Sequence, residues 1–136
     1  MRAEPRVALE AAILIVLVRL SFHVTTFAAT RRLLARVWPP RAPRESDAAE
    51  AVSAARVGAG VRAAARRLPD TTCLVEALVA DVMLRRRGVE TVLHIGVRAP
   101  SAAAALDAHA WLECHGTVVV GDADNLGEYR ILTKPS

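Results

Sequence analysis

The segment TCLVEALVADVMLRRRG, residues 72–88, decides how the rest of the chain is interpreted. Its apolar residues recur at three- and four-residue spacing, which predicts a helix with one face against a core. Thr72 is a favourable N-cap residue, the arginines at 85–87 suit the negative end of a helix dipole, and Gly88 stands where helices commonly end. Cys73 therefore falls in the first turn of this helix.

A cysteine in the first helical turn has a chemical use. The backbone N–H groups there have no helical partner, and the helix dipole favours a thiolate at Cys73. The same N–H groups can hold the oxyanion that forms when a thiolate attacks a carbonyl. The alternative for Cys73 is a small apolar residue that packs into the core.

The segment DAHAWLE, residues 107–113, predicts a strand that belongs to a β-hairpin. We expect strands at 108–114 and 117–120, joined by a two-residue turn at His115-Gly116. A regular ladder with that turn places Leu112 opposite Val119. Cys114 then points to the face opposite His109 and is expected to pack rather than react.

The same ladder supplies a third group for catalysis. It places Asp122 opposite His109, with Cβ atoms about 4.5–5.5 Å apart, so that the carboxylate can orient the imidazole toward a thiol. A loop of different length brings Asp124 into this role, because a one-residue shift turns every side chain to the other face. The sequence therefore predicts a triad of Cys73, His109 and Asp122.

The remaining elements predict an α+β fold in which helices precede a small antiparallel sheet. An apolar run spans 11–18, and a second helix spans 31–38. A third helix begins at Asp47, which forms a capping-box-like start with Glu50, and ends near Leu68. Strands are expected at 91–98 and, briefly, at 129–132. We divide the chain into N-terminal helices and connector, 1–45, and a core, 46–136, which together form one compact domain.

The N-terminal apolar segment must bury its surface against another part of the protein, a partner or a membrane. Its uninterrupted run is shorter than the roughly 20 residues that span a bilayer. Arg2 and Arg6 before an apolar stretch resemble a signal peptide, but Glu4, Glu10 and Arg19 oppose that interpretation. We expect a buried or interface helix in a cytoplasmic protein, with contact to a partner protein or a membrane surface as the alternative.

Composition excludes several function classes. The net charge is +4, yet the arginines are spread along the chain without the aromatic residues that stack on bases, so nucleic-acid binding is not expected. The two cysteines are expected to stay reduced. No cofactor is expected. No metal is expected either, because the cysteines and histidines lack paired zinc-ligand spacing, the candidates being Cys73, Cys114, His94, His109 and His115.

Four segments together resemble a known family. They are Thr72-Cys73-Leu74, the run 85–88, Ile95-Gly96-Val97 and the run 108–113, in that order. This pattern is similar to the transglutaminase-like, papain-like core of the peptidases that mature lasso peptides. The resemblance implies a helix carrying the catalytic cysteine packed on a small antiparallel sheet. It maps the catalytic residues of the family onto Cys73, His109 and Asp122.

The resemblance also implies a function. Such an enzyme removes the leader from a ribosomally made precursor peptide, so that an ATP-dependent partner enzyme can close the macrolactam. The chain resembles the stand-alone peptidase half, which implies a separate leader-binding protein. Two alternatives remain open from the residues: a non-catalytic subunit in which Cys73 and His109 only pack, and acyl transfer from the same thioester to an amine.

Overall fold

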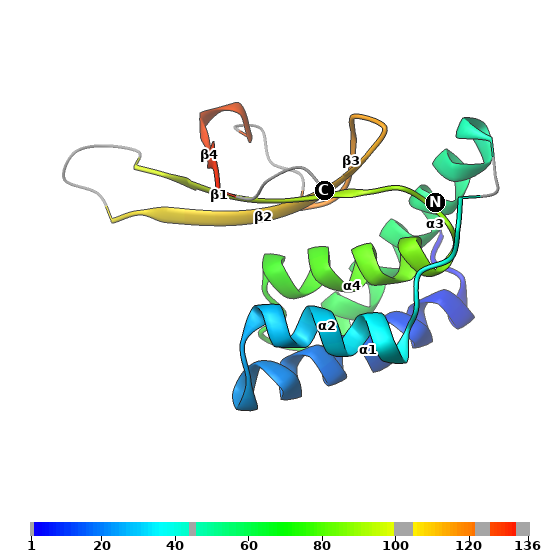
Figure 1. The fold of residues 1–136 in the computed structure, drawn as a ribbon, viewed down its shortest axis with the longest axis horizontal. Coiled ribbons are helices and arrows are strands. Elements are labelled where there is room, and N and C mark those ends of the chain that lie inside the picture. The colour runs from blue at the N-terminus through cyan, green and yellow to red at the C-terminus, as the bar shows by residue number, and fades with distance from the viewer. Residues whose placement is uncertain (1, 44–45, 100–104, 122–125, 133–136) are drawn as a thin grey trace.

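The structure is a computed structural model that describes residues 2–43, 46–99, 105–121 and 126–132. It confirms the predicted α+β class, with helices first and strands after them (Figure 1). The strands form one antiparallel sheet in the order β3-β2-β1-β4. The elements are α1 (Pro5–Val24), α2 (Phe27–Val37), α3 (Asp47–Arg67), α4 (Cys73–Arg86), β1 (Val92–Arg98), β2 (Asp107–Cys114), β3 (Thr117–Val120), the 3₁₀ helix η1 (Leu126–Glu128) and β4 (Arg130–Ile131).

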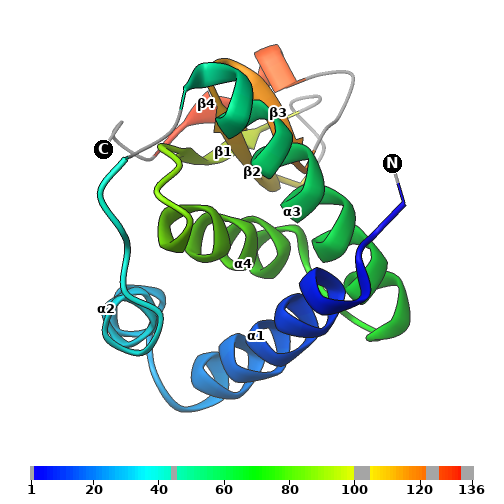
Figure 2. The same cartoon turned by 90° about the vertical axis from the view of Figure 1, so that its right-hand side faces the viewer.

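Helix α4 is the centre of the fold, with the sheet on one side and α1 on the other (Figures 1 and 2). Both predicted ends are confirmed: the Thr72 hydroxyl accepts a hydrogen bond from the Val75 N–H at 3.3 Å, and Gly88 lies at φ +75°. Nine of its 14 residues are buried, so α4 is covered on more than one face. The buried Asp81 accepts hydrogen bonds from Thr91 at 2.5 Å and Arg85 at 2.9 Å, which satisfies its charge.

Helix α1 packs across α3 and α4 through its inner face. Leu14, Ile15 and Val18 have no exposed surface there. The approach to α3 is close, because a Cβ built on Gly60 would lie 2.5 Å from the Val7 side chain. A glycine at this position lets the two backbones approach.

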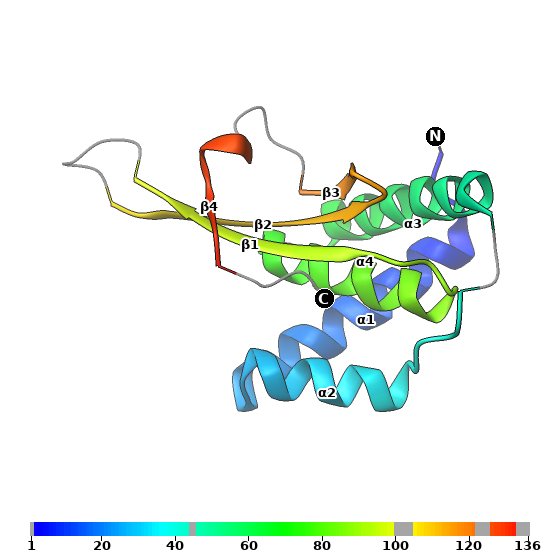
Figure 3. The same ribbon diagram turned by 45° about the horizontal axis from the view of Figure 1, so that its top comes forward.

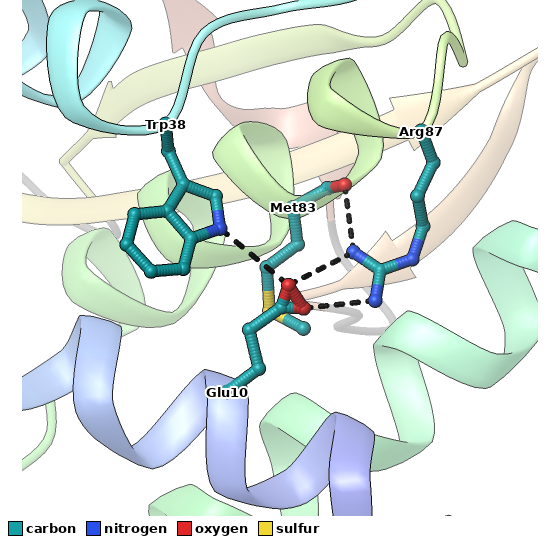
Figure 4. Close-up of polar contacts among 4 residues, drawn as sticks. All are labelled: Glu10, Trp38, Met83 and Arg87. Carbon is teal, nitrogen blue, oxygen red and sulfur yellow. Dashed lines mark hydrogen bonds and ion pairs between the residues drawn. The ribbon is translucent and has the colours of Figure 1, made fainter.

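A polar contact ties α1 to the far end of α4 (Figure 4). The Arg87 guanidinium donates to both oxygens of Glu10, at 2.8 and 3.3 Å, and also to the Met83 carbonyl at 3.0 Å. The Trp38 indole N–H donates to the same carboxylate at 3.5 Å, which brings in the end of α2. One carboxylate therefore joins three helices.

The two faces of β2 differ. Ala110, Leu112 and Cys114 point to the buried core that α4 shares, whereas His109 and Trp111 alternate to the other face. The 3₁₀ helix η1 lies on that second face, away from the helices, and leads into the edge strand β4 (Figure 1). The prediction that Cys114 packs away from His109 agrees with this arrangement.

The hairpin register differs from the regular ladder that the sequence predicts. Cys114 pairs with Thr117 and Glu113 with Val118, as expected, but Leu112 pairs with Val120 rather than Val119. The irregularity between Leu112 and Glu113 is a bulge, which shifts the register by one residue beyond it.

Helix α3 explains the bulge, since the β3 backbone lies against it (Figure 3). Arg62 donates to the Val119 carbonyl at 2.7 Å, and a Cβ built on Gly58 would lie 2.9 Å from the same oxygen. This contact holds Val119 outside the β2–β3 pairing.

The start of α2 and the cap of α3 also differ from prediction. α2 begins at Phe27, four residues early, where the Thr26 hydroxyl accepts from the Ala29 N–H at 3.2 Å. α3 begins at Asp47 as expected, but its N-cap is Ser46, and Glu50 does not reach back in a capping box. The Glu50 carboxylate is instead buried and bonded to His115.

One hydrophobic core runs through the described part of the chain. It contains buried residues from all four helices and from β1, β2 and β3. The division into 1–45 and 46–136 stays a prediction.

Candidate active site

The Cys73 thiol lies at the helix start that the sequence predicts. It is the first residue of α4, half-buried, and packs against the edge of the core. Before it, Asp70 adopts φ +63° and the Thr71 hydroxyl donates to the Leu68 carbonyl at 2.8 Å, which fixes the turn between α3 and α4. The helix start therefore presents first-turn N–H groups beside a partly accessible thiol.

One ring nitrogen of His109 is engaged in a hydrogen bond. Its Nε2 lies 2.5 Å from the Gly121 carbonyl oxygen. A carbonyl only accepts, so Nε2 carries the proton and donates it, which in the neutral ring leaves Nδ1 as the basic nitrogen. The imidazole is therefore in the tautomer that a general base acting through Nδ1 requires.

Aromatic rings surround His109. It stacks on Trp111 with centroids 5.9 Å apart and contacts Tyr129 with centroids 5.7 Å apart. His94 also stacks on Trp111, with centroids 5.2 Å apart, and its Nε2 lies 3.4 Å from a carboxylate oxygen of Glu113. These contacts restrict the rotation of the imidazole.

An ionic network lies beside the histidine, and the sequence prediction missed it. Asp107, two residues before His109 on the same face of β2, accepts from the Tyr129 hydroxyl at 2.6 Å and from Arg98 at 3.0 Å. Both bonds, the one from Tyr129 first, hold the pKa of Asp107 below its ordinary range. Arg98 also pairs with Glu128 at 2.7 Å. The two-residue spacing of Asp107 and His109 could have indicated that both lie on one face of β2. No residue near Tyr129 in the sequence indicates that it contacts them.

The third predicted residue, Asp122, lies outside the described residues, as does the alternative Asp124. The β-bulge changes the basis of that prediction, because a regular ladder put Asp122 opposite His109 and the ladder is not regular. The carboxylate was expected to bind one imidazole nitrogen of His109, and one of the two, Nε2, is bonded to the Gly121 carbonyl. Gly121 immediately precedes Asp122 in the sequence.

Cys73 and His109 lie on different sides of β2. α4 covers the face of β2 that carries Ala110 and Leu112, and His109 points to the other face. Within the described residues no hydrogen bond joins the thiol to the imidazole; the described partners of His109 are Gly121, Trp111 and Tyr129.

A second cluster lies at the opposite end of β2. The His115 ring, at the hairpin turn, is hydrogen-bonded to the buried Glu50 carboxylate, and one ligand atom from each of Asp47, Glu50 and His115 lies within 4.8 Å of the others. One imidazole and two carboxylates are a donor set that a divalent cation accepts. Glu50, by its hydrogen bond, is the largest cause of a raised pKa at His115. The sequence predicts His115 only as a surface turn residue, because its partner, Glu50, lies 65 positions away.

Cys114 lies near this cluster and has a different environment from Cys73. It is buried in the core, and burial, reinforced by Glu50 and Asp47, raises the pKa of its thiol. Such a thiol stays protonated and packs.

A scan of protein families finds a match to the transglutaminase-like superfamily over residues 14–134. The chain belongs to the transglutaminase-like superfamily. The match takes in Cys73, His109 and all four strands of this transglutaminase-like protein, together with most of α1. Searches of curated proteins and of solved structures each returned no significant match.

The superfamily includes cysteine peptidases and acyltransferases. Membership therefore agrees with the predicted fold, a cysteine helix on an antiparallel sheet with helices before it.

Proposed function

We propose that this protein is a cysteine peptidase that removes the leader from a ribosomally made lasso-peptide precursor, with help from a separate leader-binding protein. The observation that carries the proposal is Cys73 in the first turn of α4 within a chain of the transglutaminase-like superfamily. The order of the four motif segments supports the narrower assignment to lasso-peptide maturation, and the ATP-dependent enzyme that closes the macrolactam is the expected next partner.

In the proposed reaction, His109 Nδ1 takes the proton of the Cys73 thiol, and the thiolate attacks the scissile carbonyl. First-turn N–H groups of α4 stabilise the oxyanion, and His109 returns the proton to the leaving amine. Water then hydrolyses the thioester. Asp122 is proposed to orient the imidazole, at the nitrogen that now donates to the Gly121 carbonyl.

This reaction requires the imidazole to reach the thiol, and in the structure the two start from opposite faces of β2. Catalytic hydrogen bonds in unliganded enzymes often form only with substrate in place. The proposal therefore includes a rearrangement of the first half of β2 when the precursor binds.

The same separation favours a second candidate function, a non-catalytic peptide-binding subunit of a maturation complex. In that function Cys73 packs at a helix start and His109 belongs to an aromatic cluster with Trp111 and Tyr129. Acyl transfer to an amine, through the same thioester, is an alternative outcome of the first candidate and is recognised by its product.

The test is cleavage of the precursor peptide, followed by mass spectrometry, with and without the leader-binding protein. Wild type, Cys73→Ala and the matched control Cys114→Ala are compared. Peptidase function predicts leader release by wild type and Cys114→Ala and none by Cys73→Ala. A product joined to an added amine instead of water indicates acyl transfer.

Two results would contradict the proposal. If Cys73→Ala cleaves as well as wild type, the thiol is not the nucleophile. If no variant cleaves while wild type still binds the precursor in a pull-down with its partner, the binding-subunit function is correct.

A further inference from the structure

The outer face of α1 is apolar and exposed. Six large residues form a stripe along it at three- and four-residue spacing, and each is between 41% and 85% exposed: Leu9, Ile13, Val16, Leu17, Leu20 and Val24. The inner face of the same helix is buried against α3 and α4. α1 is therefore apolar on both sides, but within the described residues only its inner side is buried.

The exposed apolar surface is concentrated in one layer of the molecule. Leu33 and Val37 of the neighbouring helix α2 are each 50% exposed, whereas the other large exposed apolar residues are scattered over α3, β4 and the segments beside the sheet. Figure 2 shows that α1 and α2 form the layer farthest from the sheet. Monomeric proteins rarely leave such a contiguous apolar surface without a partner.

The charge of this layer is positive. Arg6 and Arg19 of α1, and Arg32 and Arg36 of α2, pair with no described carboxylate. Glu10 is the one acidic residue in the sequence between Pro5 and Val37, and it is turned inward to Arg87 (Figure 4). The surface thus combines an apolar stripe with arginines, and Glu4, the exposed carboxylate directly before α1, pairs with Arg56 of α3.

These features decide between occupants. A two-fold dimer through this face would bring like-charged arginines together, which opposes self-association. Within the described residues α1 is the helix long and apolar enough to cross a bilayer, but crossing would withdraw Leu14, Ile15 and Val18 from the core and break the Glu10–Arg87 contact. An anionic bilayer surface fits both the stripe and the arginines.

We propose that α1, flanked by α2, lies in the surface of an anionic lipid bilayer, with its outer leucine and valine side chains among the acyl chains and its arginines at the headgroups. The sheet, on the other side of α4, would face away from the membrane (Figure 1). The proposal does not depend on the peptidase function, because none of these residues belongs to the candidate active site.

The test is co-sedimentation of the full chain with vesicles of phosphatidylcholine alone and of phosphatidylcholine with roughly 30% phosphatidylglycerol. We expect binding to the anionic vesicles that weakens when salt is raised from about 0.1 to about 0.5 M. The Leu9→Gln, Leu20→Gln double variant should bind at least about tenfold more weakly. Its matched control, Leu106→Gln with Leu132→Gln, removes two equally exposed leucines beside the sheet and should bind as wild type.

A second pair of variants tests the charge. Arg6→Gln with Arg19→Gln should lower binding by about fivefold for each arginine at low salt. The control Arg66→Gln with Arg67→Gln, at the exposed end of α3, removes the same charge elsewhere and should have little effect. Circular dichroism and melting curves establish that each variant is folded.

Three outcomes would overturn the proposal. Equal binding by the α1 variants and their controls would mean that another surface holds the lipid. Vesicle-bound protein that resists alkaline carbonate extraction would mean that α1 crosses the bilayer. Failure of folded wild type to bind, with a dimer in gel filtration that Leu9→Gln and Leu20→Gln dissociate, would assign the stripe to a second copy of the chain.

Discussion

The two cysteines illustrate how position alone separates two thiols. Cys73 is half-buried at the start of α4, whereas Cys114 is buried in the core, where desolvation raises its pKa. We predict that iodoacetamide modifies Cys73 faster than Cys114 in the folded protein. Mass spectrometry of the single-cysteine variants Cys73→Ser and Cys114→Ser measures both rates. If the two cysteines are modified at equal rates well below the melting temperature, Cys114 is not buried as described.

Tyr129 makes two contacts beside the candidate active site, one with Asp107 and one with His109, and one substitution separates them. Its hydroxyl donates to Asp107, and its ring contacts His109. Tyr129→Phe keeps the ring and removes the hydroxyl, which is the first cause of the lowered pKa of Asp107. We expect the Asp107 pKa to rise toward its ordinary value of 3.8 in an NMR titration of the carboxyl carbon.

The sign of the stability change follows from that shift. A carboxyl whose pKa is lowered on folding contributes stability above its unfolded pKa, and the contribution is lost as the pH falls. Tyr129→Phe should therefore narrow the difference in unfolding free energy between neutral pH and about pH 3. An unchanged Asp107 titration would mean that Arg98 alone sets it.

At the scale of elements, the hairpin turn is fastened to α3 by His115 and Glu50. Glu50 raises the pKa of His115 above its usual 6.5, so the contact contributes stability that is fully present below about pH 6.5 and lost as the pH rises through the folded-state pKa. We predict that His115→Gln destabilises the protein most in mildly acidic buffer and least in alkaline buffer. Urea unfolding at several pH values measures this, with His23→Gln, an exposed histidine of α1, as control. A loss that does not depend on pH would contradict the ion pair.

The contact between α1 and α3 depends on a missing side chain. A Cβ at Gly60 would lie 2.5 Å from the Val7 Cγ1 atom, so Gly60→Ala forces the helices apart or moves Val7. We expect a loss of about 1–3 kcal/mol in unfolding free energy, measured by urea denaturation. Gly127→Ala is the control, because no atom lies within 4 Å of a Cβ there. Stabilisation by Gly60→Ala would show that helix propensity outweighs the clash.

For the whole molecule, Glu10 joins the N-terminal helices to the end of α4. Glu10→Gln removes the charge from its paired bond with Arg87, and we expect it to cost about 1–3 kcal/mol in unfolding free energy. The control Glu4→Gln breaks an exposed pair with Arg56 and should cost less than about 1 kcal/mol. Equal effects from both variants would show that the Glu10 contact is no stronger than a surface pair.

The whole-molecule arrangement also bears on catalysis. The sheet carries His109 on the face that η1 and Tyr129 cover, and α4 carries Cys73 beneath the other face. The cleavage assay therefore tests a rearrangement as well as a residue. A crystal structure with a precursor bound would test directly whether the Cys73 thiol and the His109 imidazole approach each other.

The sequence by itself determined the elements. Helix α4 with its Thr72 cap and Gly88 end, the turn at His115-Gly116 and the order of helices before strands all follow from residues a few positions apart. Such features depend on local hydrogen bonds and on periodicity, which a single segment contains. Of the resemblance that these motifs carry, membership of the transglutaminase-like superfamily is confirmed, over residues 14–134.

Only the tertiary structure decided the bulge at Val119, the partner of Glu50 and the positions of Cys73 and His109 on opposite sides of β2. Arg62 contacts Val119 across 57 residues, and His115 contacts Glu50 across 65. The sequence of a hairpin predicts its strand pairing but contains no information about the helix that packs against it. The physical reason is that register and side-chain partners are set by the surfaces that meet on folding, and those surfaces come from distant parts of the chain.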